Sequence, residues 1–248
     1  MRKAGAHIIS FLLLRHSILV QRNILEPIRS PFLPSDGDLS KNVGIISSDE
    51  SIRKALQRIE DILSNHFPGL ISSLLQPILL NLFYLTAYTQ NTVHQQIKAQ
   101  VTRILTAYLS ASSCPGADVL RLVENISHTP SAYGWTYTPG DQGGIAIRRT
   151  TADDSHDTDF DTISSRVLII VETLRDTSDM VKSEVFVGVI RYWLSPRQDD
   201  PIRYHRVKYC SNSGGLRTLS YCKNYCQIIN KTCSSHRLMG FKFAEKYY

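Results

Sequence analysis

The sequence predicts an all-α protein whose consecutive helices stack into an α-solenoid, with an irregular helical bundle as the alternative. Three observations predict this fold class. Apolar residues recur at steps of three and four residues, short breaks separate the periodic segments, and no alternating strand pattern is visible. The chain has 248 residues, of which 42% are apolar and 20% charged, so it can bury a core and wholesale disorder is excluded.

The N-terminal segment, residues 1–44, is expected to form one helix followed by a linker. Its first 25 residues contain an apolar run at 8–14 and no acidic residue before Glu26. The basic residues of this stretch are Arg2, Lys3, Arg15 and Arg22. An amphipathic helix is the preferred interpretation, and a transit peptide that would address a mitochondrial protein is the alternative. Proline, glycine and aspartate at 30–44 indicate the linker.

The clearest helix start is the tetrad Ser47-Ser48-Asp49-Glu50. A hydroxyl at the N-cap can accept from the backbone N–H of Glu50 while the carboxylate of Glu50 reaches back, which is a capping box. Apolar residues then recur at helical spacing up to about residue 65. The opposite face carries Arg53, Lys54, Arg58, Glu60 and Asp61. This pattern predicts an amphipathic helix.

Three further helices are predicted before residue 128. The second, at about 70–85, is apolar on nearly all sides and must be packed between neighbours, and Pro77 inside it predicts a kink. The third covers about 91–111 and the fourth about 117–127. The third helix is expected to direct polar residues outward, namely Gln95, Gln96, Lys98, Gln100 and Arg103.

A long non-helical loop is predicted at 128–160, followed by two more helices at 160–174 and 180–194. The β-branched run at 167–171 would also fit a buried strand, but the periodicity extends over fifteen residues and favours a helix. Residues 45–195 are therefore predicted to form a helical-repeat domain of HEAT or armadillo type.

The positive charge of the protein is concentrated at its C-terminal end. Residues 1–195 contain 18 Lys and Arg against 19 Asp and Glu, whereas residues 196–248 contain 10 against 3. The domain itself therefore offers no basic stripe for phosphates, and nucleic acid is not an expected partner of it. The basic tail at 196–248, which also holds six tyrosines and four cysteines, has no hydrophobic period and is expected to be poorly ordered.

The sequence nominates no catalytic, cofactor-binding or metal-binding residue, and we expect a protein that is not an enzyme. The eight histidines form no helical zinc pair, and no nucleophile elbow is present. The glycine-rich segment 140–144 lacks a following lysine, so it predicts a turn with positive φ at one or more glycines rather than a phosphate loop. The acidic cluster at 153–161 opens like a calcium loop, but Thr162 and Leu168 stand where glycine and glutamate are needed.

The cysteines and histidines of the tail could in principle supply a tetrahedral zinc site. They are Cys210, Cys222, Cys226 and Cys233, with His205 and His236 nearby. Their spacings do not give the two close pairs of a zinc ribbon, so no metal is expected. No membrane span is expected either, because the most apolar stretch, at 70–88, is interrupted by polar residues and a proline.

One interval supports a family resemblance. It runs from Trp135 through Pro139-Gly140, then Gly143-Gly144-Ile145, to Arg149, and it lies between blocks of apolar helices. This interval, with flanking helices at 51–85 and 183–194, resembles fungal karyopherin-like factors required for nuclear transport of RNA polymerase II. Their animal relatives are called transport and Golgi organization protein 6. The resemblance covers about residues 45–195.

The resemblance implies a noncatalytic, HEAT-like scaffold that helps RNA polymerase II subunits assemble in the cytoplasm and reach the nucleus. The expected partners are those subunits or assembly chaperones, with no small-molecule substrate and no cofactor. Members of that family are much longer solenoids, so we expect this chain to hold one internal piece, and the composition change at Pro196 suggests a fragment, an altered exon or a read-through end.

A rival hypothesis from another class is binding to nucleic acid or to a membrane surface through the basic tail. Tyrosines beside Lys and Arg in that tail would suit stacking and charge contacts.

Overall fold

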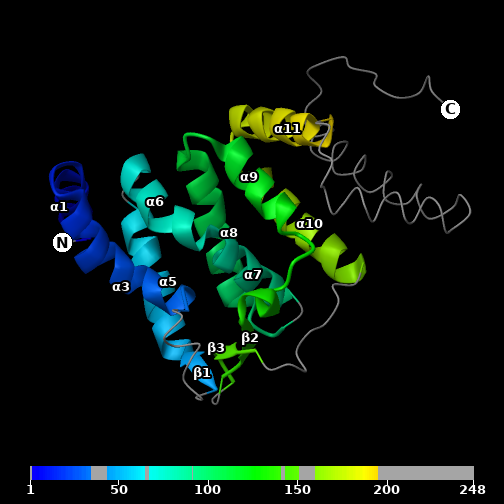
Figure 1. The fold of residues 1–248 in the computed structure, drawn as a ribbon. Helices are drawn as coiled ribbons and strands as arrows, with labels where there is room; N and C mark the ends of the chain where they lie inside the picture. The colour runs from blue at the N-terminus through cyan, green and yellow to red at the C-terminus, as the bar shows by residue number, and fades with distance from the viewer. Residues whose placement is uncertain are drawn as a thin grey trace, which may run out of the picture. The chain divides into compact units, whose positions relative to one another are not determined.

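The computed structural model describes residues 2–34, 44–64, 67–90, 92–140, 143–150 and 160–194 (Figure 1). The chain divides into two compact units, Met1–Val185 and Phe186–Tyr248, and most described residues belong to the first. The prediction for the tail at 196–248, residues 35–43 of the linker predicted at 30–44, and the acidic residues at 153–159 lie outside the described residues.

The all-α prediction is confirmed, and each helix predicted after residue 47 is present within a few residues of its expected bounds. The helices are α5 (Asp49–Leu63), α6 (Pro68–Leu75), α7 (Leu79–Gln90), α8 (Gln95–Ala111), α9 (Pro115–Glu124), α10 (Phe160–Arg175) and α11 (Asp179–Leu194). The run 167–171 lies inside α10, so the helical interpretation of that run is correct.

Helix α8 lies at the centre of the first unit. It packs against α5, α6, α7, α9 and α10 (Figure 1). Its buried face includes Val101, Ile104 and Leu105. The kink predicted at Pro77 is a single 3-10 turn, η3 (Gln76–Ile78), between α6 and α7. A proline cannot donate to the helical ladder, and the tighter turn accommodates its missing N–H.

The stretch Pro68–Gln90, which contains α6, η3 and α7, is long and apolar enough to cross a membrane by length and composition alone. In its most apolar window, however, 61% is buried inside the fold. This burial is typical of a core helix, and it explains why the stretch is apolar on nearly all sides.

The N-terminal segment is part of the same packed unit, which the predicted separation of residues 1–44 did not anticipate. It comprises α1 (Arg2–Arg15), α2 (Ser17–Val20), the π-helical turn η1 (Gln21–Leu25), α3 (Glu26–Arg29) and the 3-10 turn η2 (Ser30–Phe32). Helix α1 packs on α5 and α6, and α3 packs on α5. Leu25 and Phe32 are fully buried, so this segment contributes to the core.

The predicted loop at 128–160 contains a β-hairpin, which corrects the expectation of an irregular segment. Strands β2 (Trp135–Pro139) and β3 (Ile145–Arg149) are antiparallel, with Tyr137 opposite Ile147. A third strand, β1 (Ile45–Ser47), pairs with the other edge of β3, which gives the order β1-β3-β2 (Figure 1). The strand β1 is too short and too distant in sequence to be visible as a pattern.

Helix α5 is capped one residue later than the sequence predicts. Ser48 is the N-cap, with an extended backbone, and its hydroxyl accepts from the backbone N–H of Ser51 at 3.4 Å. Glu50 therefore does not reach back. It pairs with Lys54 at 2.6 Å, and the hydrogen bond from Lys54, together with its charge, lowers the pKa of Glu50.

Aromatic side chains hold the hairpin against α7. Tyr84 and Tyr88 of α7 lie within 6.5 Å, centroid to centroid, of Trp135 and Tyr137 respectively. The Tyr137 hydroxyl donates to the backbone carbonyl of Asn81 at 3.0 Å. Desolvation by burial raises the pKa of Tyr137 above its ordinary value.

Replacing Tyr137 with Phe should make the protein less sensitive to alkaline pH. The folded state retains a hydroxyl proton that the unfolded state releases above its ordinary pKa of 10.0. The contribution is complete below that pH and is lost as pH rises, with a slope of about 1.4 kcal/mol per pH unit. Denaturant unfolding between about pH 9.5 and 11.5 should therefore show a shallower loss of stability in Tyr137→Phe. Equal slopes in the two proteins would contradict this assignment.

Candidate functional site

Polar side chains from α5 and α8 line a groove of about 220 Å³ between these two helices. On each helix most of the lining residues follow at steps of three and four, so they share one face. The lining residues are Arg53, Gln57, Glu60, Gln96, Ile97, Gln100 and Arg103. Ile97 is buried, and most of the other side chains are wholly or partly exposed.

Glu60 joins the two sides of the groove. One carboxylate oxygen of Glu60 accepts from the side-chain amide of Gln100 at 2.8 Å, and the other pairs with the guanidinium of Arg103 at 2.9 Å. The Glu60 side chain is 26% exposed and that of Arg103 is 67% exposed. The carboxylate charge is thus compensated within the protein, and the guanidinium stays accessible at the rim.

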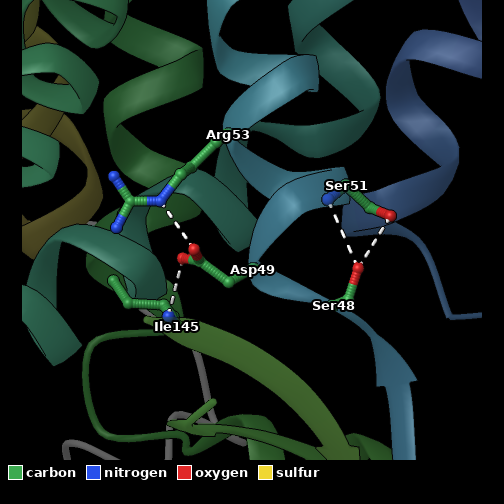
Figure 2. A network of polar contacts seen from close by, with 5 residues as sticks. All are labelled: Ser48, Asp49, Ser51, Arg53 and Ile145. Carbon is green, nitrogen blue, oxygen red and sulfur yellow. Dashed lines mark hydrogen bonds and ion pairs between the residues drawn. The ribbon is translucent and has the colours of Figure 1, made fainter. Parts of the chain in front are cut away.

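At the other end of the groove, Arg53 connects α5 to the hairpin through Asp49 (Figure 2). The Nε–H of Arg53 donates to one carboxylate oxygen of Asp49 at 2.7 Å. The other carboxylate oxygen accepts from the backbone N–H of Ile145 at 2.9 Å. Because Ile145 is fully buried, this contact satisfies a donor that water cannot reach.

The glycines of the hairpin turn allow this close approach. Gly143 has φ +79°, as predicted for a turn that needs the left-handed region. Gly144 lies so close to Asp49 that a Cβ at this position would overlap the Asp49 carboxylate. The glycine-rich segment therefore brings the hairpin against the first turn of α5 and serves packing.

Of the described residues with possible chemistry, neither Cys114 nor Asp161 lines this groove. Within the described ranges, no group of three or more His, Cys, Asp or Glu residues is placed to hold a metal ion. Cys114 is an exposed free thiol at the N-cap of α9. Asp161 is exposed in the first turn of α10, and the remaining members of its acidic cluster lie outside the described residues.

The groove offers hydrogen bonds and ion pairs. Its two arginines and one glutamate give the lining a formal charge of +1. Each guanidinium carries five N–H donors, more than the contacts to Asp49 and Glu60 use. Amide and guanidinium groups of this kind suit the backbone carbonyls and carboxylates of a bound polypeptide.

Sequence periodicity predicts outward faces for five of the groove residues but does not show that the two faces meet. Arg53 and Glu60 were assigned to the polar side of α5, and Gln96, Gln100 and Arg103 to that of α8; all five line the same groove. Lys98, also predicted outward, instead approaches Glu172 of α10 at 3.5 Å. The sequence signal for this contact is an acidic residue on one helix and a basic residue on the other. Such opposite charges occur on many pairs of helices, so they do not identify which two faces pack together.

The family model "Transport and Golgi organization protein 6 homolog, ARM-like repeat" matches residues 3–178 of the chain. The match confirms the armadillo-like fold, and it includes the N-terminal helices, which the resemblance at 45–195 had left outside. Comparison with curated proteins and with solved structures gave no match.

Proposed function

This chain belongs to the ARM-like repeat family of transport and Golgi organization protein 6 homologs, and from that membership we propose that it acts as a noncatalytic scaffold that binds other proteins. Helical repeats stack into extended surfaces on which partners bind. The α5–α8 groove is the part of this surface that we assign to a polypeptide partner.

We base this assignment on which charged groups in the groove are already paired within the protein and which are not fully used. Glu60 is compensated by Gln100 and Arg103, whereas Arg53 and Arg103 are about half exposed or more and have donors to spare. Positively charged guanidinium groups with unused N–H donors favour a partner segment that supplies carboxylates and backbone carbonyls as acceptors. A polypeptide with acidic side chains has this chemistry.

The resemblance of the hairpin region to karyopherin-like factors supports a finer proposal. We propose that the partners are RNA polymerase II subunits or the chaperones that assemble them, that binding takes place in the cytoplasm, and that the scaffold shuttles to the nucleus with its cargo. The RNA polymerase II part of this proposal depends on the resemblance alone.

Capture of partners by the full chain tests the proposal. The chain with Arg53→Gln and Arg103→Gln should retain its fold, because exposed ion pairs contribute at most about 1 kcal/mol each. Its affinity for polymerase subunits or assembly chaperones, identified by mass spectrometry, should fall about 10-fold, since each lost charge-assisted bond weakens binding.

A matched control separates the groove from general charge. Lys54→Gln with Arg58→Gln removes two positive charges from exposed residues of α5 that do not line the groove. This variant should capture the same partners as the unaltered chain. Equal losses in both variants would show that net charge, and not the groove, governs capture, and no loss in either would remove the groove from the proposal.

A further inference from the structure

Large apolar side chains stand exposed along the first two helices. They follow one another at steps of one, three and four residues, and we call them the α1–α2 patch. Its members are Ile8, Phe11, Leu14, Ile18 and Leu19. Leu14 is 87% exposed and Ile18 is 79% exposed. Five such residues within twelve positions form a larger apolar surface than single exposed residues normally give.

The opposite side of α1 is already occupied. Ala6 is buried, Ile9 and Leu13 are half-buried, and α1 packs on α5 and α6 (Figure 1). The helix is therefore apolar on two sides, and folding of this unit covers only one of them. A helix that is apolar all round requires cover on each side.

Within the segment that carries the patch, the charged side chains are all positive. The first 25 residues contain four basic residues and no acidic one. Two of the basic residues, Arg15 and Arg22, have exposed side chains, and the guanidinium of Arg15 lies 4.8 Å from the centre of the exposed Phe11 ring. Apolar side chains flanked by Lys and Arg are typical of helices that lie in the interface of an anionic bilayer.

We propose that the α1–α2 patch binds the surface of an anionic lipid bilayer, with Leu14 and Ile18 inserted below the headgroups and Arg15 and Arg22 beside the phosphates. A second copy of the chain is a poor occupant, because the same positive residues would face each other across the interface. A bilayer accepts protruding aliphatic side chains without a matching groove. The patch lies on α1 and α2, whereas the groove lies between α5 and α8. A test of lipid binding by the patch is therefore independent of a test of the proposed scaffold function.

Flotation of the full chain with vesicles tests the proposal. The chain should bind vesicles of phosphatidylcholine with about 30% phosphatidylserine more tightly than pure phosphatidylcholine vesicles. Leu14→Gln with Ile18→Gln should lower the partition coefficient on the anionic vesicles at least about 10-fold, because both insertions are lost. Since both side chains are exposed, circular dichroism should show an unchanged fold.

The matched control removes two exposed apolar residues elsewhere. Val93→Gln with Met180→Gln alters side chains that are 90% and 75% exposed, and this variant should bind vesicles like the unaltered chain. Because the basic tail is present in every variant, its contribution is the same in all of them. Equal vesicle binding by the patch variant and the unaltered chain would overturn the proposal. So would light scattering that shows a dimer of the unaltered chain and a monomer of the patch variant.

Discussion

Replacing Arg166 with Met should lower the free energy of unfolding by about 3 kcal/mol. Arg166 lies on α10 and is 5% exposed. One terminal nitrogen donates to the backbone carbonyls of Ile126 and His128, at 2.7 and 2.6 Å, and the guanidinium carbon lies 5.5 Å from the centre of the Tyr84 ring. This side chain therefore ties α10 to the turn after α9 and to α7.

The size of this loss of stability depends on the hydrogen bonds that methionine cannot replace. It fills most of the same volume, but two carbonyl oxygens lose a charged donor, and each such bond contributes about 1.5–3 kcal/mol. Relief of the desolvation of the guanidinium offsets part of that loss. Denaturant unfolding with an unchanged m-value measures the difference.

The control is Arg175→Met, on the same helix but exposed. It should change stability by no more than about 0.5 kcal/mol. An Arg166→Met protein as stable as the Arg175→Met protein would contradict the role of Arg166 as the link between α10 and α7.

Alanine at Gly144 and at Asp49 should each destabilise the protein by about 2 kcal/mol, and the double variant should lose little more than either single one. Alanine at 144 overlaps the Asp49 carboxylate and displaces it from the backbone N–H of Ile145. Alanine at 49 removes the same acceptor directly. Once the carboxylate is gone, the atoms that the new methyl group would strike are absent.

A double-mutant cycle with denaturant unfolding measures this coupling, expected at about 2 kcal/mol. Gly69→Ala is the control, because a Cβ there meets no atom within 4 Å, and a helical alanine should be neutral or stabilising. Additive losses in the cycle would show that the glycine and the carboxylate act independently, against the close approach described above.

The helices could be predicted from the sequence because each has a strong local signal. The spacing of apolar residues predicts α5 and α8, and Pro77 predicts the break between α6 and α7. These local features need little information about tertiary contacts. The cap of α5 was misplaced by one residue because Ser47 and Ser48 carry the same hydroxyl, and pairing of Ser47 in β1 decides between them.

The hairpin could not be predicted because its strands are short and lack a clear pattern, and the pairing of β1 and the groove could not be predicted because both are non-local. Strands β2 and β3 have five residues each, and β3 buries three consecutive residues, Ile145, Ala146 and Ile147, so it shows no alternation. The pairing of Ile45 with Arg148 spans about a hundred residues. Likewise, Glu60 meets Gln100 and Arg103 only after α5 and α8 have packed.

The proposed binding site for a partner polypeptide is the groove between α5 and α8. Site-specific photo-crosslinking tests it most directly, with a photoreactive amino acid in place of Gln57 or Gln96 on the two sides of the groove, or of Arg58 outside it. With purified RNA polymerase II subunits and assembly chaperones, the account predicts adducts from positions 57 and 96 and none from 58. Adducts from position 58 alone, or equally from all three positions, would contradict it.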